Sequence, residues 1–155
     1  MGFSGNFQVY LLAAGKGLRA GGPKAWRDCE GRPLLERQIE FLRPLFGPEA
    51  LTVAVQEPWL TRCRALDSKV NWTAVDADAS ALASLAALLK AQPFRQWAFI
   101  YNVDMRLWES GLFELLAEKS ARTGADALVP VYEGRKGHPV LLSPSLGPEI
   151  LKLEP

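Results

Sequence analysis

A short stretch near the N-terminus combines flexible backbone with positive charge. Between residues 15 and 24 it contains four glycines and three cations, namely Gly15, Gly17, Gly21, Gly22, Lys16, Arg19 and Lys24. Glycines allow the backbone to approach a phosphate closely, and successive N–H groups in such a loop can cradle an anion. Arg grips phosphate through two parallel hydrogen bonds, whereas Lys acts as a point charge. These residue types suit the binding of a polyphosphate.

Three kinds of phosphate loop fit parts of this stretch. A Walker loop ends in Gly-Lys-Ser/Thr, which the segment around Lys24 does not supply. The dinucleotide fingerprint Gly-x-Gly-x-x-Gly/Ala matches at Gly15, Gly17 and Ala20, but it should open directly into a helix, and a Gly-Gly-Pro run breaks one. The third kind is a longer loop that wraps a triphosphate and ends in Pro-Lys. We favour this third kind.

The same stretch carries a family resemblance. Residues 12–24, Leu-Ala-Ala-Gly-Lys-Gly-Leu-Arg-Ala-Gly-Gly-Pro-Lys, resemble the nucleotidyltransferase signature L-A-A-G-x-G-x-R-M-G-x-x-K, most closely that of the MobA/MocA group, which adds a nucleotide to molybdopterin. The resemblance implies that Gly15 and Gly17 bring backbone N–H groups to the phosphates, and that Arg19 and Lys24 offset the charge of the triphosphate and the leaving pyrophosphate. The resemblance also implies that the backbone groups of three further residues contact the nucleotide base, namely Leu12, Ala13 and Ala14.

A carboxylate follows a second apolar run. Residues 97–101 predict a central strand, and Asp104 lies just beyond its carboxyl end. Mg²⁺ is commonly bound by one or two carboxylates together with substrate phosphates. The family has Gly-Asp-Met/Gln-Pro at this point, whereas here Val103 replaces the glycine and Arg106 the proline. We expect Asp104 to hold Mg²⁺; the alternative is that it caps the following turn.

An Ala/Leu-rich segment at 79–91 predicts a helix that contains Ser84. Relatives carry Gly-x-x-x-Ser-Leu near the base or sugar, so the resemblance implies a nucleotide contact for Ser84, while packing is the ordinary role of a helical serine. Asp76 and Asp78 precede this helix, and they either contact the base or cap the helix.

A basic turn lies near the end of the chain. Residues 134–140, Gly-Arg-Lys-Gly-His-Pro-Val, resemble a G-R-x-G-H-P-V stretch on the acceptor side of the family. The resemblance implies that Arg135 and His138 meet a phosphorylated acceptor. The residues alone would favour a solvated basic turn.

The pattern along the chain alternates strands with helices. Expected strands cover 9–12, 51–55, 70–75, 97–101, 125–132 and 137–142, and expected helices cover 34–46, 58–66, 79–91, 108–121 and a start at 149–153. This alternation predicts a Rossmann-like three-layer α/β/α fold with a mostly parallel central sheet, which the resemblance identifies as the nucleotide-diphospho-sugar transferase type. Ligands bind at the carboxyl ends of such strands, so we expect the 13–24 loop and Asp104 on one rim.

Composition narrows the functional classes. The chain has 155 residues and a net charge of +1, which implies one domain and no general attraction to nucleic acid or membrane. No run is long and apolar enough to span a bilayer, and no secretion signal is visible, so we expect a cytoplasmic protein. Cys29 and Cys63 are expected as free thiols. No pattern in the sequence specifies an oligomeric state.

Together these features predict a single MobA-like NTP transferase domain over residues 1–155. Relatives continue to an Asp/Asn-x-x-Thr-Pro-Glu-Asp motif that nothing after Leu153 supplies, so we expect the C-terminal segment of the family to be missing. The expected activity is Mg²⁺-dependent transfer of NMP from CTP or GTP to a phosphorylated acceptor, molybdopterin by resemblance, with release of pyrophosphate. One alternative is a nucleotide-binding accessory protein with little turnover. Another is a sugar-phosphate nucleotidyltransferase.

Overall fold

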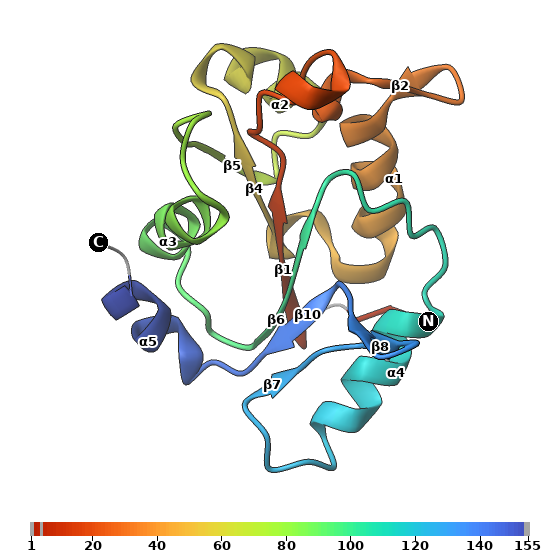
Figure 1. Ribbon diagram of the computed structural model, residues 1–155, viewed down its shortest axis with the longest axis vertical. Coiled ribbons are helices and arrows are strands. Elements are labelled where there is room, and N and C mark those ends of the chain that lie inside the picture. The colour runs from red at the N-terminus through yellow and green to blue at the C-terminus, as the bar shows by residue number, and fades with distance from the viewer. Residues whose placement is uncertain (1, 4, 154–155) are drawn as a thin grey trace.

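The computed structural model describes residues 2–3 and 5–153, and these form a sheet covered on both faces by helices (Figure 1). Within the described residues, the central sheet has six strands in the order β5-β4-β1-β6-β10-β7. Their bounds are β1 Phe7–Leu12, β4 Leu51–Val55, β5 Asn71–Ala74, β6 Trp97–Asn102, β7 Ala127–Leu128 and β10 Val140–Leu142.

The sheet is mostly parallel, as expected. β1 lies between β4 and β6 and is parallel to both, with Val9 opposite Leu51 on one side and Phe99 on the other. β5 continues the parallel arrangement beyond β4. β10 is antiparallel to β6 and to β7, so β10 alone runs in the reverse direction among the strands of this sheet in the described chain. The carboxyl ends of β1, β4 and β6 therefore meet at one edge.

Alternating side chains of β1 divide the core into two layers. Val9 and Leu11 pack with α1 (Leu34–Phe46), α2 (Leu60–Leu66) and α4 (Gly111–Ser120). Tyr10 points the other way, toward α3 (Ala81–Ala91) and α5 (Leu146–Leu153). This period of two is what a strand covered on both faces requires. Figure 1 shows α1 and α4 on one side of the sheet and α3 and α5 on the other, which confirms the three-layer prediction.

The expected strand at 125–132 is wrong as a continuous element. It divides at Pro130 into β7 and β8 (Val131–Tyr132), and β8 pairs instead with β9 (Arg135–Lys136) in a separate hairpin. Proline lacks the N–H that a ladder needs, so the strand cannot continue through it. The hairpin turn uses Glu133 and Gly134, whose φ angles are 48° and 76°.

Some other helix and strand boundaries also differ from the expected ones. α4 begins at Gly111 rather than at 108, and α5 begins at Leu146 rather than at 149. A short hairpin of β2 (Asp28–Cys29) and β3 (Arg32–Pro33) precedes α1 and was not expected. Short 3₁₀ helices complete the connections, namely η1 Leu18–Ala20, η2 Lys24–Trp26, η3 Pro48–Ala50 and η4 Glu57–Trp59. No helix formed by the described residues is long and apolar enough to cross a membrane.

Candidate active site

A pocket of about 610 Å³ opens at the carboxyl ends of the parallel strands. It is formed by the end of β1 with the loop that follows, the approach to α3, and the end of β6. The lining residues are 12–20, Lys24, Ala54, 76–79, Ala81, Ser84 and 102–104. The pocket therefore collects every residue expected to bind the triphosphate, the base or the cation.

Hydrogen bonds to both neighbouring strands fix the start of the loop. The N–H of Ala13 donates to Ala54 on one side (3.0 Å), and the carbonyl of Leu12 accepts from the N–H of Val103 on the other (3.0 Å). One residue further on, the side-chain amide of Gln56 donates to the carbonyl of Ala14 at 2.9 Å. The loop thus leaves the sheet from a rigid base, and sequence reasoning missed the part played by Gln56.

Gly17 is the glycine of the loop at which an added Cβ would collide with neighbouring backbone. Its φ is 61°, and a Cβ at this position would lie 1.9 Å from the carbonyl oxygen of Gly22. The Gly17 carbonyl accepts from the N–H groups of Ala20 (2.9 Å) and Gly22 (3.0 Å), which closes the bend. The glycine therefore serves the close approach of two backbone segments.

The backbone before this bend is rich in unused donors. The N–H groups of residues 14–19 have no hydrogen-bond acceptor within the described part of the chain. They belong to the segment that lines the pocket. Consecutive unpaired N–H groups form a concave site of partial positive charge, which favours an anion.

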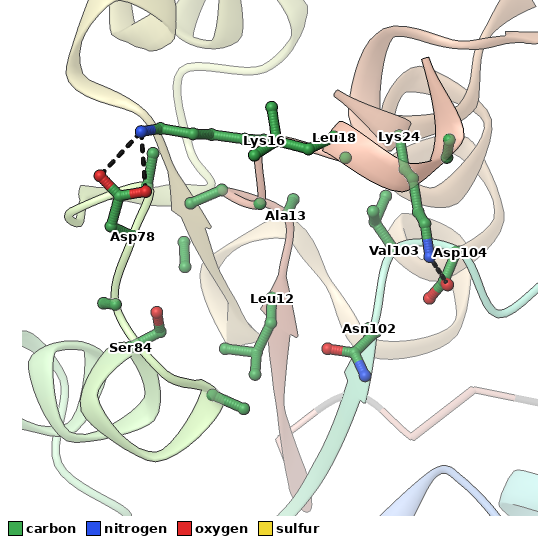
Figure 2. Close-up of a pocket in the computed structure, with 18 of the residues that line it drawn as sticks. Leu12, Ala13, Lys16, Leu18, Lys24, Asp78, Ser84, Asn102, Val103 and Asp104 are labelled. Atoms are coloured by element: carbon green, nitrogen blue, oxygen red, sulfur yellow. Dashed lines mark hydrogen bonds and ion pairs between the residues drawn. The ribbon is translucent and has the colours of Figure 1, made fainter. Parts of the chain in front are cut away.

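Two ion pairs lie on opposite sides of the pocket (Figure 2). Lys24 Nζ lies 2.5 Å from Asp104 Oδ2, and Lys16 Nζ lies 2.7 Å from the carboxylate of Asp78. Arg19 also lines the pocket, is exposed, and forms no ion pair with any residue that the structure describes. The three cations of the loop are therefore all on the pocket.

Aromatic packing holds the far end of the loop. The guanidinium of Arg62 stacks on the ring of Trp26 at 3.8 Å, and Trp59 meets the same ring edge-on at 5.4 Å. The side chain of Arg27 donates to the carbonyl of Ala20. These contacts fix η2, which begins with Lys24, and give Trp26 a packing role.

On the α3 side, the structure separates the residues that cap the helix from those that face the pocket. Ser80 caps α3 by accepting from the N–H of Ala83 at 3.1 Å. Asp76 accepts from the N–H of Asp78, so neither aspartate is the helix cap. Ser84 is only 7% exposed and lines the pocket.

On the β6 side, Asn102 lines the pocket beside Leu12 (Figure 2), and the sequence analysis did not single it out. The sequence could have indicated this role, because Asn102 follows directly after the expected strand at 97–101, whose carboxyl end points to the same edge of the sheet. Val103, which stands where relatives have glycine, is 4% exposed and packs in the core. Arg106 is exposed.

The two residues expected on the acceptor side lie outside the lining of this pocket. Arg135 is in the exposed β8–β9 hairpin, and His138 follows it and is also exposed. Neither belongs to the lining of the pocket. The structure thus brings together the triphosphate, base and cation candidates, and does not bring Arg135 and His138 to them.

The pocket suits a cation that is shared with a ligand. No group of three or more His, Cys, Asp or Glu side chains capable of holding a metal occurs among the described residues. At the end of β6, Asp104 presents a carboxylate that is 42% exposed, and the ammonium of Lys24 lies against it. One carboxylate completed by phosphate oxygens and water is a common way to bind Mg²⁺, so the donor set fits such an ion.

The fold and the pocket define an α/β/α domain of the nucleotide-diphospho-sugar transferase type, with an anion-binding loop at the carboxyl ends of its strands. The model of the MobA-like NTP transferase domain matches residues 9–155. The chain belongs to this family of nucleotidyltransferases.

Two curated relatives are bifunctional proteins. The bifunctional enzyme IspD/IspF of Bradyrhizobium diazoefficiens is 32% identical over 144 residues, 81% of this chain and 33% of that protein. The bifunctional protein GlmU of Lawsonia intracellularis is 31% identical over 118 residues, 73% of this chain and 26% of that protein. The chain thus spans a third or less of the length of each relative.

Solved structures share the fold at low identity. Rv0371c from Mycobacterium tuberculosis superposes with a TM-score of 0.74 at 20% identity, over 96% of this chain and 76% of that chain. A manganese complex of Rv0371c gives 0.71 at 18% identity, with the same coverage. Molybdopterin-guanine dinucleotide biosynthesis protein A from Archaeoglobus fulgidus gives 0.69 at 18% identity, over 94% of this chain and 71% of that chain.

Proposed function

We propose that residues 1–155 act as a single NTP transferase domain that moves a nucleoside monophosphate from an NTP to a phosphorylated acceptor. An oxygen of the acceptor phosphate attacks the α-phosphorus of the NTP. The bond between the α-phosphorus and the oxygen that bridges it to the β-phosphorus breaks, and pyrophosphate leaves with the electron pair. No side-chain nucleophile is needed, so the protein acts by positioning and electrostatic stabilisation.

The observation that carries the proposal is the contact between Lys24 and Asp104 on the rim of one pocket. A cation from the glycine loop and a carboxylate from the end of β6 come together where the unpaired N–H groups of residues 14–19 lie. The negative charge of a triphosphate must be offset by donors and cations at once, and the carboxylate would hold the divalent cation that adds to them.

Each group has a task in this proposal. The N–H groups of Gly15 and Gly17 hold phosphate oxygens. Arg19 and Lys24 offset charge on the triphosphate and on the leaving pyrophosphate. Asp104 would hold Mg²⁺, which when bound neutralises charge that develops on the phosphates. The groups assigned to the nucleoside are the backbone of Leu12, Ala13 and Ala14 together with Ser84.

The proposed donor is CTP or GTP and the proposed acceptor is molybdopterin. The resemblance of the loop to the MobA/MocA group supports this choice, as does the fold shared with the Archaeoglobus fulgidus protein. On the acceptor side we assign Arg135 and His138, whose exposed positions leave them accessible to a second substrate. The manganese complex of Rv0371c supports a divalent cation.

Two other functions have specific support. A sugar-phosphate acceptor is favoured by the relative GlmU, which is 31% identical to this chain. An accessory nucleotide-binding protein with little turnover is favoured by the departures at Val103 and Arg106 from the family pattern. Both keep the same pocket and differ in what reacts there.

The test is a pyrophosphate-release assay with each of the four NTPs, Mg²⁺, and either molybdopterin or a panel of sugar and polyol phosphates. We expect release with CTP or GTP and molybdopterin, and on the order of 10³-fold less with Asp104→Asn, because several kcal/mol of charge stabilisation is lost. Release only with a sugar phosphate supports the second function. Tight NTP binding without pyrophosphate release in the presence of any acceptor supports the third function, the accessory nucleotide-binding protein.

A further inference from the structure

Gln38 is a buried amide on α1 that holds the loop carrying Asp104. Its exposed fraction is 0%. Nε2 donates to the carbonyl oxygen of Val103 at 3.0 Å and to that of Met105 at 2.6 Å. These two carbonyls lie immediately before and after Asp104 in the chain. A primary amide has two N–H donors, and here both are used.

The rest of this segment is fixed as well. The hydroxyl of Tyr101 lies 3.5 Å from Gln38 Oε1, and burial raises the pKa of Tyr101, so the hydroxyl stays protonated and donates. The N–H of Val103 donates to Leu12 at 3.0 Å, and that of Met105 donates to Asn102 at 3.1 Å. Both flanks of Asp104 are therefore held to the sheet and to α1.

An amide at this position is not what packing alone requires. The neighbouring α1 residues that face the core are apolar, as Leu35, Ile39 and Leu42 show. A buried polar side chain is costly unless its hydrogen bonds are made. Among the described residues, the side chain of Gln38 forms hydrogen bonds only with residues 101–105, so we take this segment to be the reason for its presence.

We infer that Gln38 is a positioning residue, which fixes the carbonyls of Val103 and Met105 so that the carboxylate of Asp104 faces the pocket. The inference rests on the proposed function, in which Asp104 holds the divalent cation. Groups that orient metal ligands commonly change metal affinity by about 10- to 100-fold when removed. Without Gln38, both carbonyls lose their donor, and the flanks of Asp104 are held only through the N–H groups of Val103 and Met105.

The first experiment measures Mn²⁺ affinity by electron paramagnetic resonance in the presence of CTP or GTP. Gln38→Met keeps the length of the side chain but removes both donors. We expect Mn²⁺ to bind at least about tenfold more weakly than in the wild type. The matched control is Leu42→Ala, which weakens the packing of the same helix but leaves the donors, and its Mn²⁺ affinity should stay within about twofold.

A double mutant separates positioning from general loosening. In an Asp104→Ala background, Gln38→Met should cause no further loss of Mn²⁺ affinity, because its effect passes through the missing carboxylate. A further loss of the same size in that background overturns the inference.

Hydrogen exchange of the ligand-free proteins supplies a readout that needs no nucleotide. The amide of Met105 should exchange faster in Gln38→Met and should be unchanged in Leu42→Ala at the same temperature, well below either melting point. Equal acceleration in both variants shows a structural role alone and contradicts the inference.

The two proposals fail in different ways. If the wild type binds Mn²⁺ with none of the NTPs, the proposed function is wrong. If the wild type binds Mn²⁺ with an NTP and Gln38→Met binds it equally well, the proposed function stands and the role of Gln38 is wrong.

Discussion

Lys24 Nζ and Asp104 Oδ2 lie 2.5 Å apart, although 80 residues separate them in the chain. The topology accounts for this contact, because β1 and β6 are adjacent and parallel and therefore release their loops at the same edge of the sheet. The two side chains are 41% and 42% exposed, so solvent reaches both. An exposed pair of this kind contributes little to folding, and either partner can be recruited by a ligand.

Lys24→Ala should impair nucleotide binding far more than it impairs folding. A charged hydrogen bond to phosphate contributes about 1.5–3 kcal/mol, so NTP affinity should fall roughly 10- to 100-fold. The unfolding free energy should change by less than about 1 kcal/mol, because the pair with Asp104 is exposed. Isothermal titration calorimetry and urea unfolding measure the two quantities. Lys152→Ala, which removes the exposed pair with Glu149, is the matched control and should change neither. Unchanged affinity in the Lys24 variant would remove this residue from the site.

Asp78→Asn should strengthen the binding of inorganic tripolyphosphate. In the ligand-free protein, Lys16 is paired with Asp78 across the pocket, and the carboxylate competes with phosphate for the ammonium. Such an exposed pair is worth up to about 1 kcal/mol, so its removal should raise affinity by up to about fivefold. Tripolyphosphate has no base or sugar, which isolates this effect from any nucleoside contact of Asp78. A weaker binding constant in the variant would show that the pair does not restrain Lys16.

Gly17→Ala should distort the loop, because the new Cβ would meet the carbonyl of Gly22 and the backbone φ is positive. We expect a loss of about 1–3 kcal/mol in unfolding free energy, which lowers Tm by about 3–8 °C in a domain of this size. Gly15→Ala is the control for stability, since nothing lies within 4 Å of its Cβ position. Thermal denaturation followed by circular dichroism compares the two, and equal melting temperatures would contradict the role assigned to Gly17.

Cys63 should make folding sensitive to alkaline pH. Burial raises the pKa of its thiol from 9.0 to about 11, an effect that the charge of Arg62 partly offsets. Because the pKa is higher in the folded state, the stabilisation is fully present below about pH 9 and is lost as the pH rises through 11.

Urea unfolding at pH 8 and pH 10.5 tests this effect. The wild type should lose about 1–2 kcal/mol more than Cys63→Ala over that interval, because the variant has no thiol to titrate. Parallel losses in the two proteins would show that other groups cause the decline.

The architecture was predictable from the sequence because its signals are local. The buried run of β1, the wholly buried β4 and the Ala/Leu-rich α3 lie where their patterns predict them. Pro130 indicated an edge strand or a bulge, but the division into two strands of separate sheets was not expected, because valines continue the pattern on both sides of it.

The composition of the site was predictable only in part. The residue types of the glycine loop and of Asp104, and their positions after expected strands, indicate phosphate chemistry. The topology places them at the same edge of the sheet. Nothing in the sequence distinguishes Gln38, Gln56 and Asn102 from other polar residues. The two glutamines bond to segments that lie 42 and 67 positions away in the chain. No local pattern encodes such a partner.

The six consecutive backbone N–H groups at residues 14–19 attract anions through the dipoles of their peptide groups. Peptide groups neither gain nor lose protons over the range in which proteins stay folded. The attraction of this loop for anions is therefore built into the chain and does not vary with acidity. Where these N–H groups hold a phosphate, the dependence of their binding on pH between about 6 and 8 should follow the ionisation of the ligand's own terminal phosphate.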